Sequence, residues 1–320
     1  MSGHRRDSDH AVVTGGAGFI GSNVCERLLS DGFDVTSVDN FASGRPENVA
    51  HLRDDPQFES VQADVRNPLP SFESVDYVLH FASRASPDDF QTHPVEIALT
   101  NSVGMRNALD LAVEHDACFV YASTSEVYGN PDVHPQRESY NGCVDPRGPR
   151  AQYDESKRFG ETLGKAYVEE YGLDFRTMRI FNTYGPRMRA DDGRVIPNFL
   201  TQALAEQDLT IYGDGTQTRS FCYVDDLVEG VREVMETPEM SDEVVNLGNT
   251  NEITINTLAE TVIDVTDSAT SVTHEDRPSG DPDLRCPDIE RAKTILDWEP
   301  QTSLETGLQH TAEYFGTQSK

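Results

Sequence analysis

Residues 14–21 read TGGAGFIG and follow the apolar stretch Ala11–Thr14, which predicts a buried strand. Gly15, Gly18 and Gly21 have the spacing Gly-x-x-Gly-x-x-Gly. Glycine permits a tight turn, and it lets backbone N–H groups approach a pyrophosphate at the start of the helix expected next. A strand, a glycine turn and a helix in this order predict a dinucleotide-binding loop. The residues assigned to the loop are Gly15, Gly18, Phe19, Ile20 and Gly21.

The first half of the chain alternates short apolar strands with helical patterns. Strands are expected at residues 11–14, 34–38, 58–62, 77–81, 118–122 and 174–180. Helical periodicity is visible at 19–31, 94–115 and 153–171. Alternation of this kind predicts an α/β fold with a Rossmann-type, doubly wound parallel sheet.

The alternation of expected strands and helices changes near residue 185, where glycine and proline become more frequent. We expect residues 1–185 to form the dinucleotide-binding Rossmann domain. Residues 186–320 are expected to form mainly a smaller α/β domain that binds the substrate. The apolar run Val244–Leu247 predicts a strand, and we expect a segment near 240–250 to return to the first sheet.

Polar residues after the second and third strands bear on the choice of dinucleotide. Asp39 stands 18 residues after the last glycine of the loop. A carboxylate there accepts hydrogen bonds from an adenosine ribose and repels a 2′-phosphate, which favours NAD over NADP. Against this, Arg45 is close enough in sequence to bind a phosphate. We group Asn40 with Asp39, and we expect Asp64 and Val65, after the third strand, to contact the adenine.

Tyr153 and Lys157 are four residues apart in an expected helix and therefore share one of its faces. A lysine ammonium favours a neighbouring phenolate, so we expect Lys157 to let Tyr153 act as a base nearer neutral pH. Thr124, Ser125 and Glu126 follow the strand at 118–122. Because ligands bind beyond the carboxyl ends of strands in such sheets, these three side chains are expected in the same cleft.

The net charge is strongly negative. The 320 residues include 56 acidic and 26 basic ones, giving a formal charge of −30, and only four are lysines. Such a surface repels nucleic acid and anionic membranes. The stretch Met1–His10 is polar and has no apolar signal region, so we expect a cytoplasmic protein with no nucleic-acid or membrane partner. The five cysteines form no Cys-x-x-Cys pair, so no metal site is expected.

Several stretches of the sequence match the pattern of a known protein family, and together they extend over nearly the whole chain. They are Val12–Ser22, Ala122–Gly129, His134–Gln136, Gly148–Arg150, Tyr153–Arg158, Arg179–Met188, Asp192–Val195, Tyr212–Phe221, Asn246–Asn249 and Pro287–Ile289. Through them the chain resembles the extended short-chain dehydrogenase/reductases that act on nucleotide sugars, the NAD-dependent epimerase/dehydratase family. Within that group it most resembles the UDP-glucuronate decarboxylases, also called UDP-xylose synthases.

The resemblance implies bound NAD, a UDP-sugar substrate and a homodimer. The catalytic residues that it implies are Thr124, Ser125, Glu126, Tyr153, Lys157 and Arg285. Tyr153 and Lys157 would also contact the cofactor. The substrate-binding residues that it implies are Asn182, Arg194, Tyr212 and Arg219. An arginine among them would give paired, charge-assisted hydrogen bonds to a phosphate.

The implied reaction is the decarboxylation of UDP-glucuronate to UDP-xylose through a 4-keto intermediate, with NAD recycled within the site. Ser125-Glu126 resembles the decarboxylases, since dehydratases usually carry Asp-Glu there and 4-epimerases usually lack the acid. A 4,6-dehydratase or a 4-epimerase with the same oxidation step stays open as an alternative. A non-catalytic NAD-binding protein is a third interpretation, which the intact Thr124, Tyr153 and Lys157 set disfavours.

The chain departs from the family pattern at four positions. Arg84 stands where proline is usual, Phe90 where tyrosine is usual, Leu99 where lysine is common and Asn141 where tryptophan is common. In the family, the loop that contains the first two borders the sugar. The sequence therefore determines the type of reaction better than it determines which sugar is bound.

The acidic composition predicts a protein adapted to a halophilic cytoplasm. Self-repulsion at a net charge of −30 destabilises the folded state. Molar salt screens this repulsion because it shortens the Debye length to roughly 3 Å. We therefore expect the thermal midpoint of unfolding to rise between low salt and molar KCl. A midpoint that stays level or falls over this range would contradict the prediction.

Overall fold

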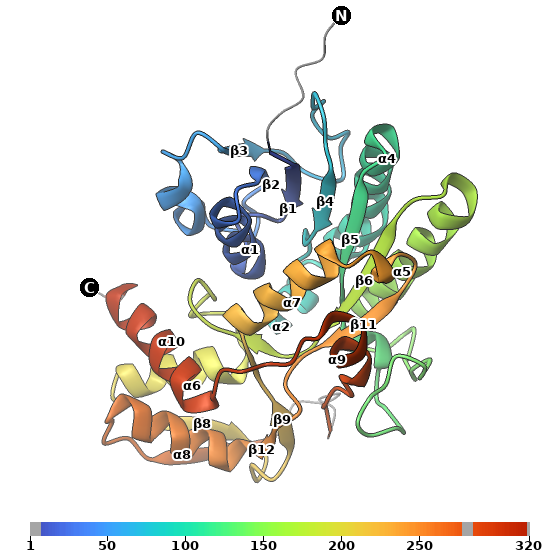
Figure 1. Ribbon diagram of the computed structural model, residues 1–320. Helices are drawn as coiled ribbons and strands as arrows, with labels where there is room; N and C mark the ends of the chain where they lie inside the picture. The colour runs from blue at the N-terminus through green and yellow to red at the C-terminus, as the bar shows by residue number, and fades with distance from the viewer. Residues whose placement is uncertain (1–7, 277–283, 319–320) are drawn as a thin grey trace, which may run out of the picture.

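In the described part of the chain, a seven-stranded parallel sheet forms the centre of the molecule (Figure 1). The computed structural model describes residues 8–276 and 284–318, so residues 1–7 of the polar N-terminal stretch lie outside it. All neighbouring strands of this sheet pair in parallel. In spatial order they are β11 (Val244–Leu247), β6 (Phe175–Ile180), β5 (Cys118–Thr124), β4 (Tyr77–His80), β1 (His10–Thr14), β2 (Asp34–Asp39) and β3 (Phe58–Gln62).

Helices cover both faces of the sheet because its central strands bury side chains on both sides. Val12 and Val13 are adjacent in β1 and fully buried, yet they belong to two separate apolar cores. Successive strand residues point to opposite faces, so no face is left for water. The covering helices are α1 (Phe19–Ser30) and α7 (Val224–Glu236) on one face, and α4 (Met105–His115) and α5 (Ala151–Tyr171) on the other.

The helical stretch expected at 94–115 consists of three pieces. Helix α3 (Pro94–Leu99) continues through a π-helical turn, η2 (Thr100–Gly104), into α4. A Cβ on Gly104 would lie 2.6 Å from Cγ2 of Val65, so this turn approaches the loop after β3 closely. Thr100 at the start of the turn faces the cavity described below. Single π turns of this kind often occur at functional sites.

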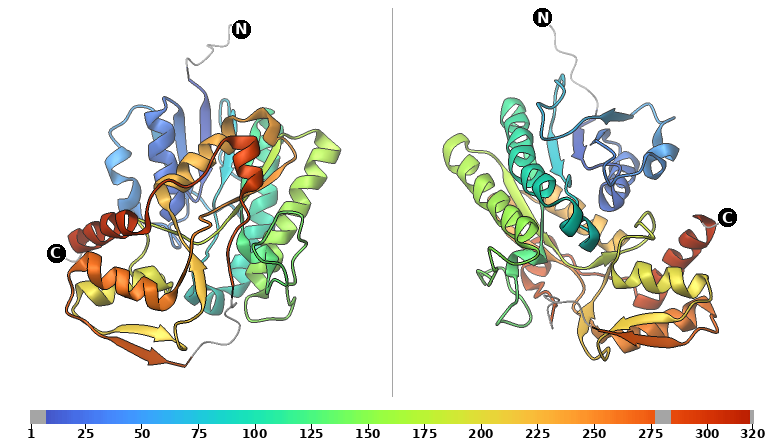
Figure 2. Two further views of the ribbon diagram at one scale, coloured as in Figure 1. Left: turned by 60° about the horizontal axis from the view of Figure 1, so that its bottom comes forward. Right: turned by 180° about the vertical axis from the view of Figure 1, so that it is seen from behind.

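The C-terminal half forms a second lobe at the carboxyl edge of the sheet (Figures 1 and 2). Its helices α6 (Val195–Leu204), α8 (Ile255–Thr266) and α10 (Leu304–Gln318) pack against one another. Three strand pairs accompany them: β8 (Leu209–Tyr212) with β13 (Val272–Glu275), β9 (Thr218–Ser220) with β12 (Glu252–Thr254), and β7 (Thr183–Tyr184) with β10 (Cys222–Tyr223). The shorter helical segments are η1 (Pro46–Leu52), α2 (Pro87–Thr92), η3 (Ser125–Tyr128), η4 (Pro238–Met240) and α9 (Glu290–Leu296).

The predicted fold class is confirmed, and so is the returning strand, because β11 pairs with β6 in the central sheet. The return is longer than the expected segment near 240–250, since α7 also packs against α1 and β6. The division of the chain at residue 185 into two domains stays a prediction. Within residues 8–276 and 284–318, every helix is too short or too polar to cross a membrane.

Candidate active site

A cavity of about 590 Å³ lies at the carboxyl edge of the sheet, where the second lobe faces it. Parallel strands end at the same edge, so the loops after them meet there. The predicted site residues that line this cavity are Gly15, Gly18, Phe19, Ile20, Gly21, Asp39, Asn40, Val65, Thr124, Ser125, Glu126, Tyr153, Lys157, Asn182, Arg194, Tyr212, Arg219 and Arg285. Asp64 is not among the lining residues. The structure therefore gathers residues from positions 15 to 285 into one site.

Gly15 and Gly21 of the glycine loop have no room for a side chain. Gly15 has a φ of +71°, and a Cβ there would lie 2.8 Å from the backbone nitrogen of Ala82. A Cβ on Gly21 would lie 2.2 Å from the carbonyl oxygen of Gly15. Gly18 precedes α1, whose first turn carries no acidic residue. The loop thus presents bare backbone at a helix N-terminus, which fits the pyrophosphate of a dinucleotide.

The Asp39 carboxylate is fixed at the cavity wall by two backbone hydrogen bonds. Its Oδ2 accepts from the N–H of Ala17 at 3.0 Å, and its Oδ1 accepts from the N–H of Phe41 at 2.8 Å. Each oxygen has a further lone pair that can accept from a ribose hydroxyl. The residues present therefore fit an NAD molecule with its pyrophosphate on the glycine loop and its adenosine ribose at Asp39.

The Asp64 carboxylate is paired with Arg66 and Asn40, and its expected contact with the adenine stays a prediction. Its Oδ2 accepts from Arg66 Nη2 at 2.5 Å and from Asn40 Nδ2 at 3.1 Å. The hydrogen bonds from Arg66 hold the pKa of Asp64 well below its usual range. Val65 lines the cavity, whereas the Asp64 carboxylate is occupied by these two partners. In this arrangement Asp64 orients Asn40, which itself lines the cavity.

Tyr153, Lys157 and Thr124 line the cavity together at the carboxyl end of β5. Lys157 Nζ donates to the carbonyl oxygen of Ala122 at 2.8 Å and lies 6.0 Å from the centre of the Tyr153 ring. Burial lowers the pKa of Lys157 to about 7. Burial also raises the pKa of Tyr153 to about 12, although a hydrogen bond with Thr124 and the charge of Arg194 act in the opposite direction.

The net pKa of Tyr153 is raised, so burial outweighs the influences that favour the phenolate, and the expected effect of Lys157 on Tyr153 stays a prediction. Both side chains are buried, and burial disfavours the phenolate as well as the ammonium. The ammonium is also directed to a backbone carbonyl group. The geometry of the pair is nevertheless the expected one, since both side chains reach the same cavity from one face of α5.

Glu126 is held between two arginines. Its Oε1 lies 2.8 Å from Arg150 Nη2, and its Oε2 lies 3.0 Å from Arg285 Nη2. Arg285, which is only 3% exposed, also donates to the carbonyl oxygen of Ser125. Burial alone would raise the pKa of Glu126, but the charges of Arg285 and Arg150 outweigh it and lower the pKa. Glu126 is therefore a carboxylate at neutral pH.

Arg150 is a site residue whose role is not evident from the sequence. It directly precedes α5 and stands three residues before Tyr153. Its guanidinium lies 5.2 Å from the centre of the Phe90 ring, and that ring lies 4.8 Å from the Tyr153 ring. Arg150 was part of the matched stretch Gly148–Arg150, but no spacing rule connects it with Glu126. Only the fold brings the two together.

The wall formed by the second lobe supplies polar groups for a nucleotide. Arg219 in β9 is buried and donates to the carbonyl oxygen of Thr218 at 2.7 Å. Arg194, just before α6, donates to the carbonyl oxygen of Ala85 in the loop after β4. Tyr212, at the end of β8, is 41% exposed. These groups and Asn182 fit the predicted diphosphate and nucleoside contacts, which stay a prediction.

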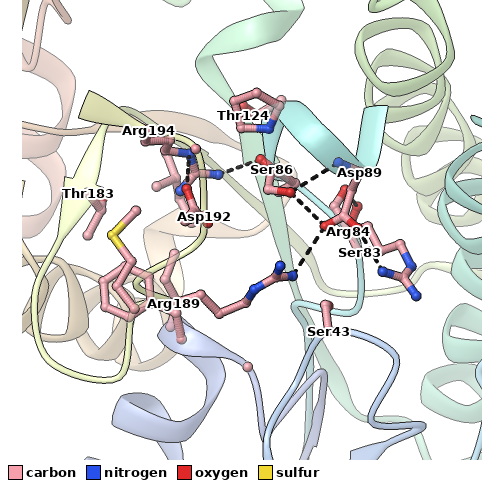
Figure 3. Close-up of a pocket in the computed structure, with 18 of the residues that line it drawn as sticks. Ser43, Ser83, Arg84, Ser86, Asp89, Thr124, Thr183, Arg189, Asp192 and Arg194 are labelled. Atoms are coloured by element: carbon pink, nitrogen blue, oxygen red, sulfur yellow. Dashed lines mark hydrogen bonds and ion pairs between the residues drawn. The ribbon is translucent and has the colours of Figure 1, made fainter. Parts of the chain in front are cut away.

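The loop after β4, which departs from the family pattern, is tied down by ion pairs (Figure 3). Arg84 Nη1 lies 2.7 Å from Asp89 Oδ1, and Arg84 Nε lies 3.2 Å from Glu96 Oε1. Asp89 also accepts from Ser86 Oγ at 2.7 Å. Arg189 approaches the same carboxylate to 3.7 Å from the opposite wall. The arginine at position 84 is thus accommodated by two acids at the edge of the cavity.

The other three positions that depart from the family pattern differ in whether they line the cavity. Phe90 lines the cavity, whereas Leu99 and Asn141 are not among its lining residues. Leu99 is 42% exposed, and the carbonyl oxygen of Asn141 accepts from Arg158 at 2.7 Å. Of the four departures, Arg84 and Phe90 are therefore the two that can affect the substrate directly.

Residues 11–248 match a known protein family, the NAD dependent epimerase/dehydratase family. The chain belongs to this family. UDP-glucuronic acid decarboxylase 1 of Xenopus tropicalis is 46% identical over 310 residues, which cover 97% of this chain and 73% of that protein. UDP-glucuronic acid decarboxylase 2 of Arabidopsis thaliana is 47% identical over 306 residues, with coverage of 96% and 68%. The family's dependence on NAD agrees with the glycine loop and Asp39.

Solved structures of the family share the fold. UDP-glucose 4-epimerase of Thermotoga maritima, solved with UDP-glucose, has a TM-score of 0.89 and 30% identity, covering 97% of this chain and 100% of that one. UDP-glucuronic acid 4-epimerase of Bacillus cereus, solved with UDP-glucuronic acid and NAD, has a TM-score of 0.85 and 27% identity, with coverage of 97% and 99%. DesIV, a dTDP-glucose 4,6-dehydratase of Streptomyces venezuelae, has a TM-score of 0.86 and 30% identity, with coverage of 96% and 96%.

The buried Lys157 should reduce stability in a pH-dependent way. Its pKa of about 7 lies below the ordinary lysine value of 10.5, so between these values the unfolded chain binds a proton that the folded chain lacks. Stability therefore rises with pH through this window, and the penalty is complete below about pH 7. Lys157→Met removes the penalty, so its thermal midpoint relative to wild type should be more favourable at pH 6 than at pH 9.

Lys165→Met is the matched control because Lys165 stands on the same helix and its side chain is 51% exposed. We expect its difference from wild type to change little between the two pH values. Differential scanning calorimetry at constant salt measures both variants. An equal difference between Lys157→Met and wild type at pH 6 and pH 9 would contradict the assignment of a buried, destabilised ammonium.

Proposed function

We propose that this protein decarboxylates UDP-glucuronate to UDP-xylose through a 4-keto intermediate, with NAD recycled within the site. The observation that carries the proposal is the clamp of Arg150 and Arg285 on Glu126, next to the Thr124, Tyr153 and Lys157 centre. Such a cluster offers cations to a substrate carboxylate beside a group that can oxidise a sugar alcohol. The decarboxylases that are 46% and 47% identical to the chain support the same activity.

The clamp also argues against the alternative of a 4,6-dehydratase. A dehydratase needs an acid that gives a proton to the departing hydroxyl group. Two arginines lower the pKa of Glu126, so it is a poor donor at neutral pH. A 4-epimerase needs no such acid, and a cluster of two arginines and a carboxylate would have no evident role in it. We therefore keep the dehydratase and epimerase activities as outcomes that the assay must exclude.

In the proposed oxidation step, Thr124, Tyr153 and Lys157 each have a role. NAD⁺, when bound, supplies the acceptor for the C4 hydride, a positive charge that favours the phenolate, and later the same hydride for the return step. Tyr153 takes the proton of the C4 hydroxyl, and Thr124 holds that hydroxyl through its own side chain. Lys157 and Arg194 provide the positive charge that lowers the cost of the phenolate in this buried position.

The second step follows from the chemistry of the ketone. Oxidation at C4 leaves the carboxylate at C5 in the β position to a carbonyl group. Carbon dioxide can then leave because the electrons of the broken bond enter the carbonyl as an enolate. Hydrogen bonds from Thr124 and Tyr153 stabilise that oxyanion, and Arg285 and Glu126 orient the carboxylate and the group that reprotonates C5.

We also propose a cytoplasmic homodimer. Val95, Leu99, Val103 and Phe159 are large apolar side chains exposed on α3, η2 and α5, with exposed fractions of 70%, 42%, 36% and 46%. An apolar surface of this kind on two neighbouring helices supports burial against a second copy. The five cysteines are free thiols, which is usual in a reducing cytoplasm.

Incubation of the purified protein with UDP-glucuronate and NAD⁺ tests the proposed function. We expect carbon dioxide and UDP-xylose in equal amounts, with no net formation of NADH. Tyr153→Phe should abolish turnover because the C4 proton acceptor is lost, while NAD binding measured by calorimetry should stay within a few-fold of wild type. Tyr171→Phe, an exposed tyrosine at the end of the same helix, is the matched control and should keep full activity.

Other products would contradict the proposal. A 4-keto-6-deoxy sugar from UDP-glucose or dTDP-glucose would indicate a dehydratase, and UDP-galacturonate would indicate an epimerase. Failure to convert any nucleotide sugar, with NAD still bound, would indicate a non-catalytic protein. Unchanged turnover by Tyr153→Phe would refute the role given to Tyr153.

A further inference from the structure

Asp154 is a buried acid next to the catalytic tyrosine that the mechanism above does not use. It stands in the first turn of α5, is 8% exposed, and does not line the cavity. Within the described residues its Oδ1 is fully buried and has no hydrogen-bond partner. A buried carboxylate oxygen without a donor is costly, and the neutral acid is the cheaper form. The geometry alone therefore favours a protonated Asp154.

The charged groups around Asp154 come from three parts of the chain. Glu126 on η3 disfavours a second negative charge, and Glu155 on α5 acts in the same direction. Arg150 before α5 and Arg285 before α9 act in the opposite direction. Burial is the largest influence and, with Glu126, it raises the pKa of Asp154 to about 7. Asp154 can thus hold a proton at neutral pH and also lose it.

The proposed reaction consumes one proton in each turnover. A substrate carboxylate leaves as neutral carbon dioxide, and C5 gains a hydrogen in its place. The proton must come from an acid in or near the site. Glu126 is kept ionised by Arg150 and Arg285, so it has no proton of its own to give in the resting site.

We propose that Asp154 is the proton reservoir of the decarboxylation and recharges Glu126, or the solvent molecule that Glu126 orients, when C5 is protonated. This role rests on the proposed function. Asp154 lies one helical turn after Arg150, since its N–H donates to the carbonyl oxygen of Arg150 at 3.1 Å, and Arg150 in turn pairs with Glu126. Asp154 acts through Glu126 and is therefore a positioning and proton-supplying residue that does not contact the substrate.

The step balances as follows. The bond between C5 and the carboxylate carbon breaks, carbon dioxide leaves, and the electron pair forms the C4–C5 enolate. The enolate returns to the ketone as a C5–H bond forms with a proton that passes from Asp154 through Glu126. Asp154 is left as a carboxylate, which Arg150 and Arg285 stabilise until it takes a proton from solvent. No oxidant or reductant is required in this step.

Asp154→Asn tests the reservoir because it keeps the shape of the side chain and removes its transferable proton. With UDP-glucuronate we expect kcat to fall by roughly 10²-fold, as for the loss of a general acid. In the wild type, kcat should decline above about pH 7 as Asp154 loses its proton. The variant should lack that part of the decline and show a larger solvent deuterium isotope effect. Glu155→Gln removes the neighbouring and more exposed acid. It should keep the wild-type kcat at pH 6, and its decline with pH should move slightly to lower pH, because Glu155 helps to raise the pKa of Asp154.

A second variant, Asp154→Glu, tests the same role with an acid retained at this position. Asp154→Glu retains an acid and should restore a decline with pH at a shifted midpoint, even if Asp154→Asn does not fold. An unchanged kcat and pH profile in Asp154→Asn would overturn the proposal. So would an equal loss at every pH with an unchanged isotope effect, or an unshifted midpoint in Asp154→Glu. Failure of the proposed function is distinguishable, because the wild type would then release no carbon dioxide.

Discussion

The site depends on the ion pairs of Glu126 with the buried Arg285 and the partly exposed Arg150. These pairs connect the end of β5, the start of α5 and the segment before α9, which are far apart in sequence. Removal of one partner from a buried pair costs about 3–5 kcal/mol because the remaining charge is left without compensation. The same contacts that connect these three segments therefore also set the charge of the reaction site.

The Glu126 cluster and the Tyr153–Lys157 pair line the same cavity but have different electrostatic surroundings. Burial disfavours the charged forms of both Tyr153 and Lys157, so a ligand that brings positive charge would favour the phenolate. Glu126 is ionised already and surrounded by cations. In the proposed reaction, one cavity combines a centre that oxidises the sugar with a cluster that binds its carboxylate, so a shared family fold can serve a reaction that goes beyond oxidation.

The sequence predicted those features that depend on local geometry. The glycine loop, the strand at Val244–Leu247 and the shared face of Tyr153 and Lys157 follow from spacing and periodicity, and the structure contains all three. It could not predict burial. The raised pKa of Tyr153 and the pairing of Arg150 with Glu126 arise only when distant segments pack together. The position of Asp64 after a strand predicts a contact with the adenine, and the pairing of its carboxylate with the nearby Arg66 is visible only in the structure.

The most direct test of this account is a single-turnover experiment with Glu126→Gln and UDP-glucuronate labelled in the carboxylate carbon. Oxidation at C4 is followed by chemical trapping of the 4-keto sugar, and decarboxylation is followed by labelled carbon dioxide. We expect the variant to form the 4-keto sugar still, while it releases carbon dioxide roughly 10²-fold more slowly because the substrate carboxylate is no longer held in place. Release of carbon dioxide at the wild-type rate would contradict the account, and so would an equal loss of both steps in a folded variant.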